Sequence, residues 1–288
     1  MKSIKIQLDE KFRPVTQEVI DNARQYVSLR EKTADELSSL IEELLKQAAE
    51  AITIACYKYD IDPETFTISS TYDEKLFAEI SDILDELEDD ILDLVLEYSL
   101  KCTNKENNRN NILPWLLTLG RDNRNLQQTL ENRLWSFSRD VEALIVAMKL
   151  AKRKEMEAIS RIKSNLHTVY ITPEVKAAMK NPNVQATYIR TKGIKKGNQG
   201  NSNSEANNIE RFGVITTQMA WMRNLRLDYE EEGAEGFYVI RTTNYDCPLC
   251  DSHVGFHKLT ETEHFPPFHG SCQCLPIPIY IKEEIKSE

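Results

Sequence analysis

The stretch that decides the fold of the C-terminal region runs from Cys247 to Cys274 and reads CPLCDSHVGFHKLTETEHFPPFHGSCQC. It holds four of the six cysteines and four of the five histidines in the 288-residue chain. Thiolate and imidazole are the ligands that zinc prefers, and a tetrahedral site needs four of them. The stretch therefore predicts a structural metal site.

Two pairs of cysteines have the spacing of metal ligands. Cys247 and Cys250 form a Cys-x-x-Cys turn, which lets two sulfurs converge on one ion. Cys272 and Cys274 are two residues apart, so they face the same side of an extended strand. His269 is a fifth candidate. Free thiols or disulfides are the alternative to metal binding, although reduced surroundings inside a cell favour metal.

Other thiols and imidazoles are assigned lesser roles. His253, His257 and His264 are expected to be solvated or to lie beside the ligands rather than to bind the ion. Cys56 and Cys102 stand alone within helical patterns, and we expect both to be inert, buried thiols.

The order of residues in this stretch resembles the C-terminal signature of the minor head (head morphogenesis) proteins of tailed phages, including the Mu F-like proteins. The shared features are the Cys-x-x-Cys, Gly255 in the spacer, and Pro266-Pro-Phe-His-x-x-Cys-x-Cys followed by Leu-Pro-Ile-Pro278. Arg211 matches an arginine near the start of the family's helix, where a buried ion pair or a helix-start contact is expected. The likeness covers residues 209–281.

The chain also departs from that signature. It reads His-Gly-Ser-Cys-Gln-Cys where the family usually has His-Pro-x-Cys-Arg-Cys, and Ser252-His-Val-Gly255 where the family has Leu-Asp-Gly. These changes keep the metal pattern but put any role of the missing arginine in doubt. Because the family pattern includes the histidine together with the thiols, we prefer a zinc site of Cys247, Cys250, His269 and Cys272, with Cys274 in reserve.

The resemblance implies a minor structural protein of the phage head, made in the cytoplasm of the host bacterium and carried in the virion. Such proteins associate with the portal and capsid components, support capsid assembly and DNA packaging or delivery, and in some cases contact DNA. A run of about 18 apolar residues is absent from the sequence, so we expect no membrane contact.

Charge is spread unevenly along the chain. The net charge of −10 argues against a protein that coats nucleic acid with its whole surface. Residues 76–100 carry nine acids and no base, which is typical of a solvated helix face, with a docking face for a basic partner as the alternative. Residues 149–196 carry twelve bases against three acids. A solvated basic face is the ordinary interpretation of that segment, and the candidates for DNA contact are Lys149, Lys152, Arg153, Lys154, Arg190, Lys192, Lys195 and Lys196.

Apolar periodicity predicts a mainly helical α+β chain. Helices are expected from Pro14 to about residue 29, from a capping box at Thr33, and over 73–101, 112–119, 126–163, 172–179 and 209–229. Strands are expected at 237–243 and 275–281. The prediction is an antiparallel helical bundle over 1–165 with Trp115 and Trp135 in its core, a basic and Asn/Gly/Ser-rich linker region over 166–208, and a small zinc-stapled domain over 209–288.

Signatures of several enzyme classes are missing from the sequence. It contains no His-Glu-x-x-His, no Gly-x-Ser-x-Gly, no phosphate-binding Gly-x-x-x-x-Gly-Lys-Ser/Thr, and no His-x-Glu ahead of the Cys-x-x-Cys. A non-enzymatic protein is therefore favoured. The alternatives are a zinc-stapled nucleic-acid-binding protein, or an enzyme that acts as a thiol redox catalyst through Cys247 and Cys250 or as a toxin-like transferase.

Overall fold

The computed structural model describes residues 10–68, 73–119, 124–185, 204–241, 246–269 and 272–282. Within these ranges the chain is mainly helical and carries a three-stranded antiparallel sheet. No helix in these ranges is both long and apolar enough to cross a lipid bilayer.

The chain falls into two compact units that are not consecutive segments. The first comprises Met1–Leu37, Val95–Leu116 and Val214–Glu288, and the second comprises Ser38–Leu94 and Leu117–Gly213. The division of the chain at residues 165 and 208 and the antiparallel bundle both stay predictions.

Helix α1 is continuous over Gln17–Lys58, so the predicted helix start at Thr33 is wrong. The sequence has neither glycine nor proline between these bounds, and nothing interrupts the backbone hydrogen bonds. Apolar residues keep helical spacing through the expected break, with Val27 and Leu37 both buried. The Thr33 hydroxyl donates to the Leu29 carbonyl, 2.9 Å away, instead of capping a helix start.

Helix α2 covers Glu74–Leu100, close to the predicted range, and α3 covers Glu106–Thr118. The start of α3 lies inside an asparagine-rich segment, six residues before the helix predicted over 112–119. Asn108 explains the difference, because it is buried and its amide donates to the Asp228 carboxylate, 2.8 Å away. This tertiary hydrogen bond helps to offset the low helix propensity of asparagine.

The predicted helix over 126–163 is two helices, α4 over Leu126–Leu150 and α5 over Glu155–Asn165. The break lies at Lys152, whose φ of 54° is in the left-handed region. Apolar residues continue with helical spacing on both sides of this turn, so periodicity alone could not reveal it. At its other end, α4 begins with a reciprocal capping box between Asn125 and Gln128.

Two shorter elements follow, the 3-10 turn η1 at Val169–Ile171 and helix α6 at Pro173–Ala178. Helix α6 confirms the short helix predicted after Thr172. Helix α8 then covers Glu205–Glu231, starting four residues before the predicted position. Its early start is stabilised by the buried Asp140 carboxylate, which accepts a hydrogen bond from the Glu205 amide at 2.7 Å.

The extent to which the three tryptophans are buried differs from the prediction, which placed Trp115 and Trp135 in a helical core. Trp115 and Trp135 are only half-buried. The fully buried one is Trp221 of α8, which is 1% exposed and donates its indole N–H to the Tyr98 carbonyl, 2.8 Å away. A partner for the indole N–H is what makes such deep burial of tryptophan favourable.

The sheet has the order β2-β1-β3 and is antiparallel throughout. Its strands are β1 at Gly236–Ile240, β2 at Gly255–Lys258 and β3 at Leu275–Ile279. Strand β3 lies at an edge, as its two prolines predict, because proline cannot donate to a ladder. Strand β2 was not predicted.

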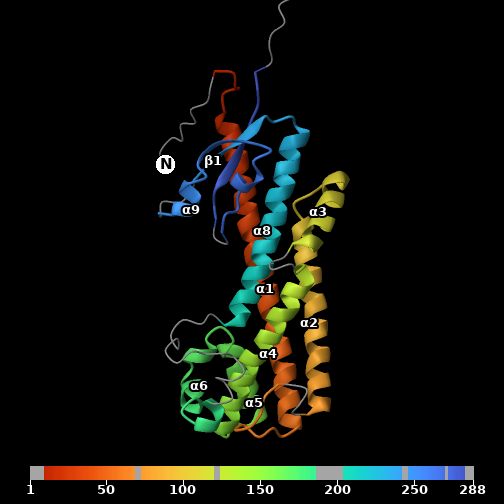
Figure 1. Cartoon of the computed structure of the whole chain (residues 1–288), viewed down its shortest axis with the longest axis vertical. Helices are drawn as coiled ribbons and strands as arrows, with labels where there is room; N and C mark the ends of the chain where they lie inside the picture. Colours follow the sequence, from red (N-terminus) through yellow and green to blue (C-terminus); the bar gives the residue numbers. More distant parts are fainter. Residues whose placement is uncertain are drawn as a thin grey trace, which may run out of the picture. The chain divides into compact units, whose positions relative to one another are not determined.

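The two faces of the sheet enter different apolar clusters, because side chains alternate along a strand. Phe237 and Val239 of β1 pack with Tyr229 of α8 and with the cysteines. Ile240 of β1 and Ile277 of β3 pack instead with the first turns of α1, whose contacts are Ile20, Ala23 and Val27. Figure 1 shows the sheet beside the start of α1. The cysteine cluster therefore lies on the sheet face opposite this apolar contact.

The contact between β3 and α1 predicts a large effect of truncating Ile277, which is 0% exposed. Ile277→Ala should lower the free energy of unfolding by about 2–5 kcal/mol, since it removes buried methyl groups and leaves a cavity. The matched control is Ile281→Ala, at a side chain that is 47% exposed, and we expect a change of roughly 1 kcal/mol or less. Urea unfolding at fixed metal concentration measures both; equal effects would contradict this packing.

Candidate metal centre

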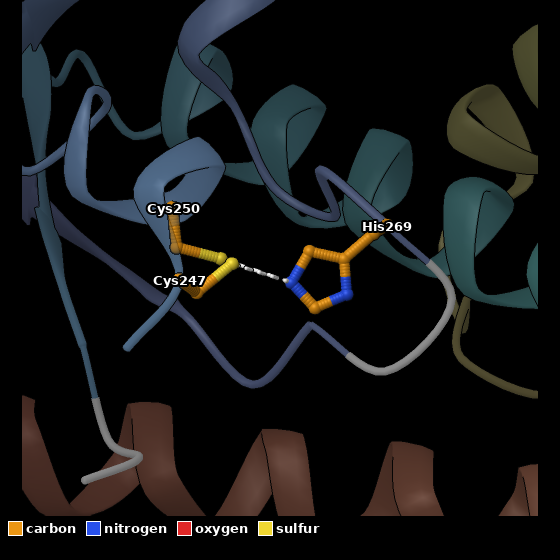
Figure 2. A group of neighbouring side chains, drawn as sticks. All are labelled: Cys247, Cys250 and His269. Atoms are coloured by element: carbon orange, nitrogen blue, oxygen red, sulfur yellow. Dashed lines mark hydrogen bonds between the residues drawn. The ribbon is translucent and has the colours of Figure 1, made fainter. Parts of the chain in front are cut away.

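Cys247 and Cys250 lie at either end of one helical turn, α9 at Pro248–Asp251. Cys247 has the extended backbone of an N-cap, and Pro248 occupies the first turn, where its missing N–H has no helical partner to lose. Residues three apart lie on one face of such a turn. Figure 2 shows both sulfurs directed toward the ring of His269.

The first candidate metal-binding group consists of Cys247, Cys250 and His269. The His269 Nε2 atom lies 3.4 Å from the Cys247 sulfur and 3.1 Å from the Cys250 sulfur. Its side chain is half-buried, and so is that of Cys247, whereas Cys250 is 3% exposed. The structure thus brings the predicted histidine onto the predicted pair of thiols.

The second candidate group consists of Cys250, Cys272 and Cys274. The sulfurs of Cys250 and Cys272 are 4.0 Å apart. All three residues are buried, and the two later ones lie just before β3, on the chain that leads into the sheet. Cys250 therefore belongs to both groups and joins all five predicted ligands.

These distances fit a tetrahedral ion. With Zn–S bonds of about 2.3 Å and Zn–N bonds of about 2.0 Å, two sulfurs lie about 3.8 Å apart, and a sulfur and a nitrogen about 3.5 Å apart. The S–S separation of 4.0 Å and the S–N separations of 3.1 and 3.4 Å lie close to these expected values. One ion has room for four of the five residues; the choice of Cys272 over Cys274 stays a prediction.

The thiols have unequal acidities. Burial, with contributions from the neighbouring cysteines, raises the pKa of Cys250 to about 12. A hydrogen bond from Cys274 lowers the pKa of Cys272 to about 5, and the same pairing together with burial raises the pKa of Cys274.

Two arginines border the cluster. Arg30 of α1 is 1% exposed and donates from Nη2 to the Cys272 carbonyl, 2.8 Å away. Arg241 follows β1 and forms an ion pair with Asp251 of α9; that carboxylate, aided by the nearby thiolates, raises its pKa. Both guanidinium groups thus contact residues of the chain segments that carry the candidate ligands.

The other three histidines form a stacked group rather than a set of ligands. The Nδ1 atoms of His253 and His264 lie 2.9 Å apart, so one of them must carry the proton and donate it to the other. His257 stacks on His264, and Phe268 stacks on His253. Burial and the two neighbouring imidazoles lower the pKa of His253. All three rings are half-buried, and neither candidate metal-binding group among the described residues includes them, so their place beside the ligands stays a prediction.

Two of the candidates for DNA contact pair with carboxylates, and four lie outside the described residues. Lys149 is largely buried and pairs with Asp60, and Arg153 pairs with Glu157. Arg190, Lys192, Lys195 and Lys196 lie outside the described residues, whereas Lys152 and Lys154 are exposed. DNA contact stays a prediction.

Three further residues were assigned roles from sequence. Arg211 is exposed on α8, so the buried ion pair expected of it is excluded. Cys56 is fully buried as expected, and Cys102 is half-buried. Burial raises the pKa of both thiols to about 12, which agrees with their expected inertness.

Arg30 is the residue of this site that sequence reasoning missed. It continues the buried stripe of Ile20, Ala23 and Val27 at the next helical position, so an arginine stands where an apolar residue is expected. That break in the pattern was the available signal.

No protein-family model, curated protein or solved structure matches the chain.

The burial of the thiols predicts a defined pattern of alkylation by N-ethylmaleimide. In metal-loaded chain, the four clustered cysteines should be protected, and removal of metal by a chelator should expose them. Cys56 should stay unmodified in both states, because it is buried and its pKa is about 12. Peptide mapping by mass spectrometry reads the sites; modification of the cluster at one rate in both states would contradict the metal site.

Proposed function

We propose that the chain is a minor structural protein of a tailed-phage head whose C-terminal region is held together by a structural zinc ion. The observation that carries the metal proposal is the sharing of Cys250 by two groups of candidate ligands. The phage assignment is supported by the order of the same residues in the sequence, Cys-x-x-Cys followed by Pro-Pro-x-His-x-x-Cys-x-Cys.

A structural role is favoured over a catalytic one. A catalytic zinc keeps one coordination position open to water or substrate, whereas a structural zinc is enclosed by protein ligands. Here five candidate ligands compete for four positions, and Cys250, Cys272 and Cys274 are each at most 3% exposed. This arrangement supports a closed site.

The same geometry disfavours thiol redox chemistry at the Cys-x-x-Cys. Attack on a disulfide requires a thiolate, and burial raises the pKa of Cys250 to about 12, which makes Cys250 a poor attacking group. His269 also lies 3.4 and 3.1 Å from the two sulfurs of this pair, distances suited to a shared ion. An ion at this point would occupy both sulfurs.

In a minor head protein, the ion would act as a cross-link. It would fasten the chain before β2 to the chain before β3 and so restrain two short strands. The resulting rigid region would face the portal or capsid components. The exposed Lys152 and Lys154 are the described candidates for DNA contact.

Metal content tests the zinc proposal. Purified full-length chain should contain about one zinc per molecule by inductively coupled plasma mass spectrometry, because four ligands enclose one ion. Cys247→Ser and Cys250→Ser should lose the metal along with C-terminal folding, since metal binding and folding are coupled.

Cys102→Ser is the control for these variants, because its half-buried thiol lies outside both candidate groups. It should keep the metal. Wild-type chain that is purified without chelator and contains no metal would falsify the zinc proposal.

Purified phage heads test the assignment to the virion. Quantitative mass spectrometry should find the chain in few copies relative to the major capsid protein. Cys250→Ser should reduce its incorporation, because the folded C-terminal region is lost, while Cys102→Ser should not. A chain that is abundant in the infected cell but missing from heads would rule out the structural role.

A further inference from the structure

Arg30 is a buried cation with an unusual shortage of partners. Its Nη2 atom donates to the Cys272 carbonyl at 2.8 Å, but Nε and Nη1 are buried and have no hydrogen-bond acceptor among the described residues. A guanidinium stays protonated in proteins, and burial of an unpaired charge is strongly unfavourable. The side chain therefore needs a compensating negative charge nearby.

The groups that act electrostatically on Arg30 are Cys272, Cys274, Glu31 and Tyr26. Cys272 has the largest effect of these, and Tyr26 is a phenol that donates to the Trp221 carbonyl. Glu31 is the chain neighbour of Arg30, is half-buried, and forms no ion pair with it within the described ranges. Of these groups, Cys272 is the one whose residue Arg30 contacts directly, through the 2.8 Å hydrogen bond to the Cys272 carbonyl.

We propose that Arg30 neutralises a metal–thiolate centre that contains Cys272 and at least two further cysteines. A divalent ion with three thiolates and one neutral imidazole carries one net negative charge, which one guanidinium balances. Four thiolates give two negative charges, which Arg30 and Arg241 would balance together. Two thiolates and two imidazoles give none, and Arg30 would stay uncompensated.

The position of Arg30 on α1 gives this charge a structural consequence. Ile20, Ala23 and Val27 hold the first turns of α1 on one face of the sheet, and Arg30 extends the same stripe to Cys272. The thiolate charge that the metal centre would hold beside Cys272 therefore favours burial of this helix segment. The inference rests on the proposed metal site and adds a residue remote in sequence that tunes it.

A matched pair of substitutions in the full-length chain isolates the charge. Arg30→Lys keeps the positive charge, and Arg30→Gln removes it, while either side chain can still donate to the Cys272 carbonyl. Zinc affinity is measured by competition with a chromophoric chelator, and coupled folding by far-UV circular dichroism over the same titration. Arg24→Gln is the control, because Arg24 lies on the same helix but is hydrogen-bonded to Asp21.

We expect Arg30→Gln to bind zinc about tenfold or more weakly than Arg30→Lys, since partners just outside the ligand shell typically tune metal affinity by this factor. Arg24→Gln should match the wild type. If Arg30→Gln is unfolded without metal, the zinc concentration needed to fold it should exceed that of Arg30→Lys by the same factor. Equal values for the Lys and Gln variants would overturn the proposal.

Cobalt substitution tests the ligand set independently. Thiolate-to-cobalt charge-transfer absorption in the wild-type chain should correspond to three or four sulfur ligands, and Cys272→Ser should reduce it. A spectrum of two sulfurs would overturn the charge argument even with zinc bound. Wild-type chain that binds neither ion would instead remove the proposed metal site itself, so the two failures are distinguishable.

Discussion

The convergence of five ligand candidates on the sulfur of Cys250 is the constraint on which the C-terminal region depends. All five candidates lie on the two loops that connect strands of four or five residues. Cys247 and Cys250 lie on the loop between β1 and β2, and Cys272 and Cys274 lie just before β3. A metal ion that binds both pairs would join the loop before β2 to the loop before β3.

The sheet separates two kinds of stabilisation. One face is held by apolar contact with the first turns of α1, and the other covers the thiols together with Tyr229 of α8. The Tyr229 hydroxyl donates to the Pro276 carbonyl at 2.9 Å, which links α8 to β3 on the cysteine side. Arg30 is the residue of α1 that connects this apolar contact with the thiol cluster, through its hydrogen bond to the Cys272 carbonyl.

Single polar residues set the start or end of several helices where the local sequence pattern did not predict it. Asn108 helps an asparagine-rich segment into a helix by bonding Asp228, and Asp140 stabilises the early start of α8. Lys152 interrupts a helix whose apolar spacing continues without a break. In each case a single residue with a specific partner or backbone angle outweighs propensity, which differs by less than about 1 kcal/mol between ordinary residues.

By itself, the sequence determined the mainly helical class, the edge strand with its two prolines, and the five candidate ligands, because these depend on residue type and short-range spacing. Only the tertiary structure decided the rest. The joining of both cysteine pairs through Cys250, the strand β2, and the burial of Arg30 against Cys272 require residues far apart in the chain to meet. Local periodicity carries no information about such contacts, since the partner lies up to 242 positions away.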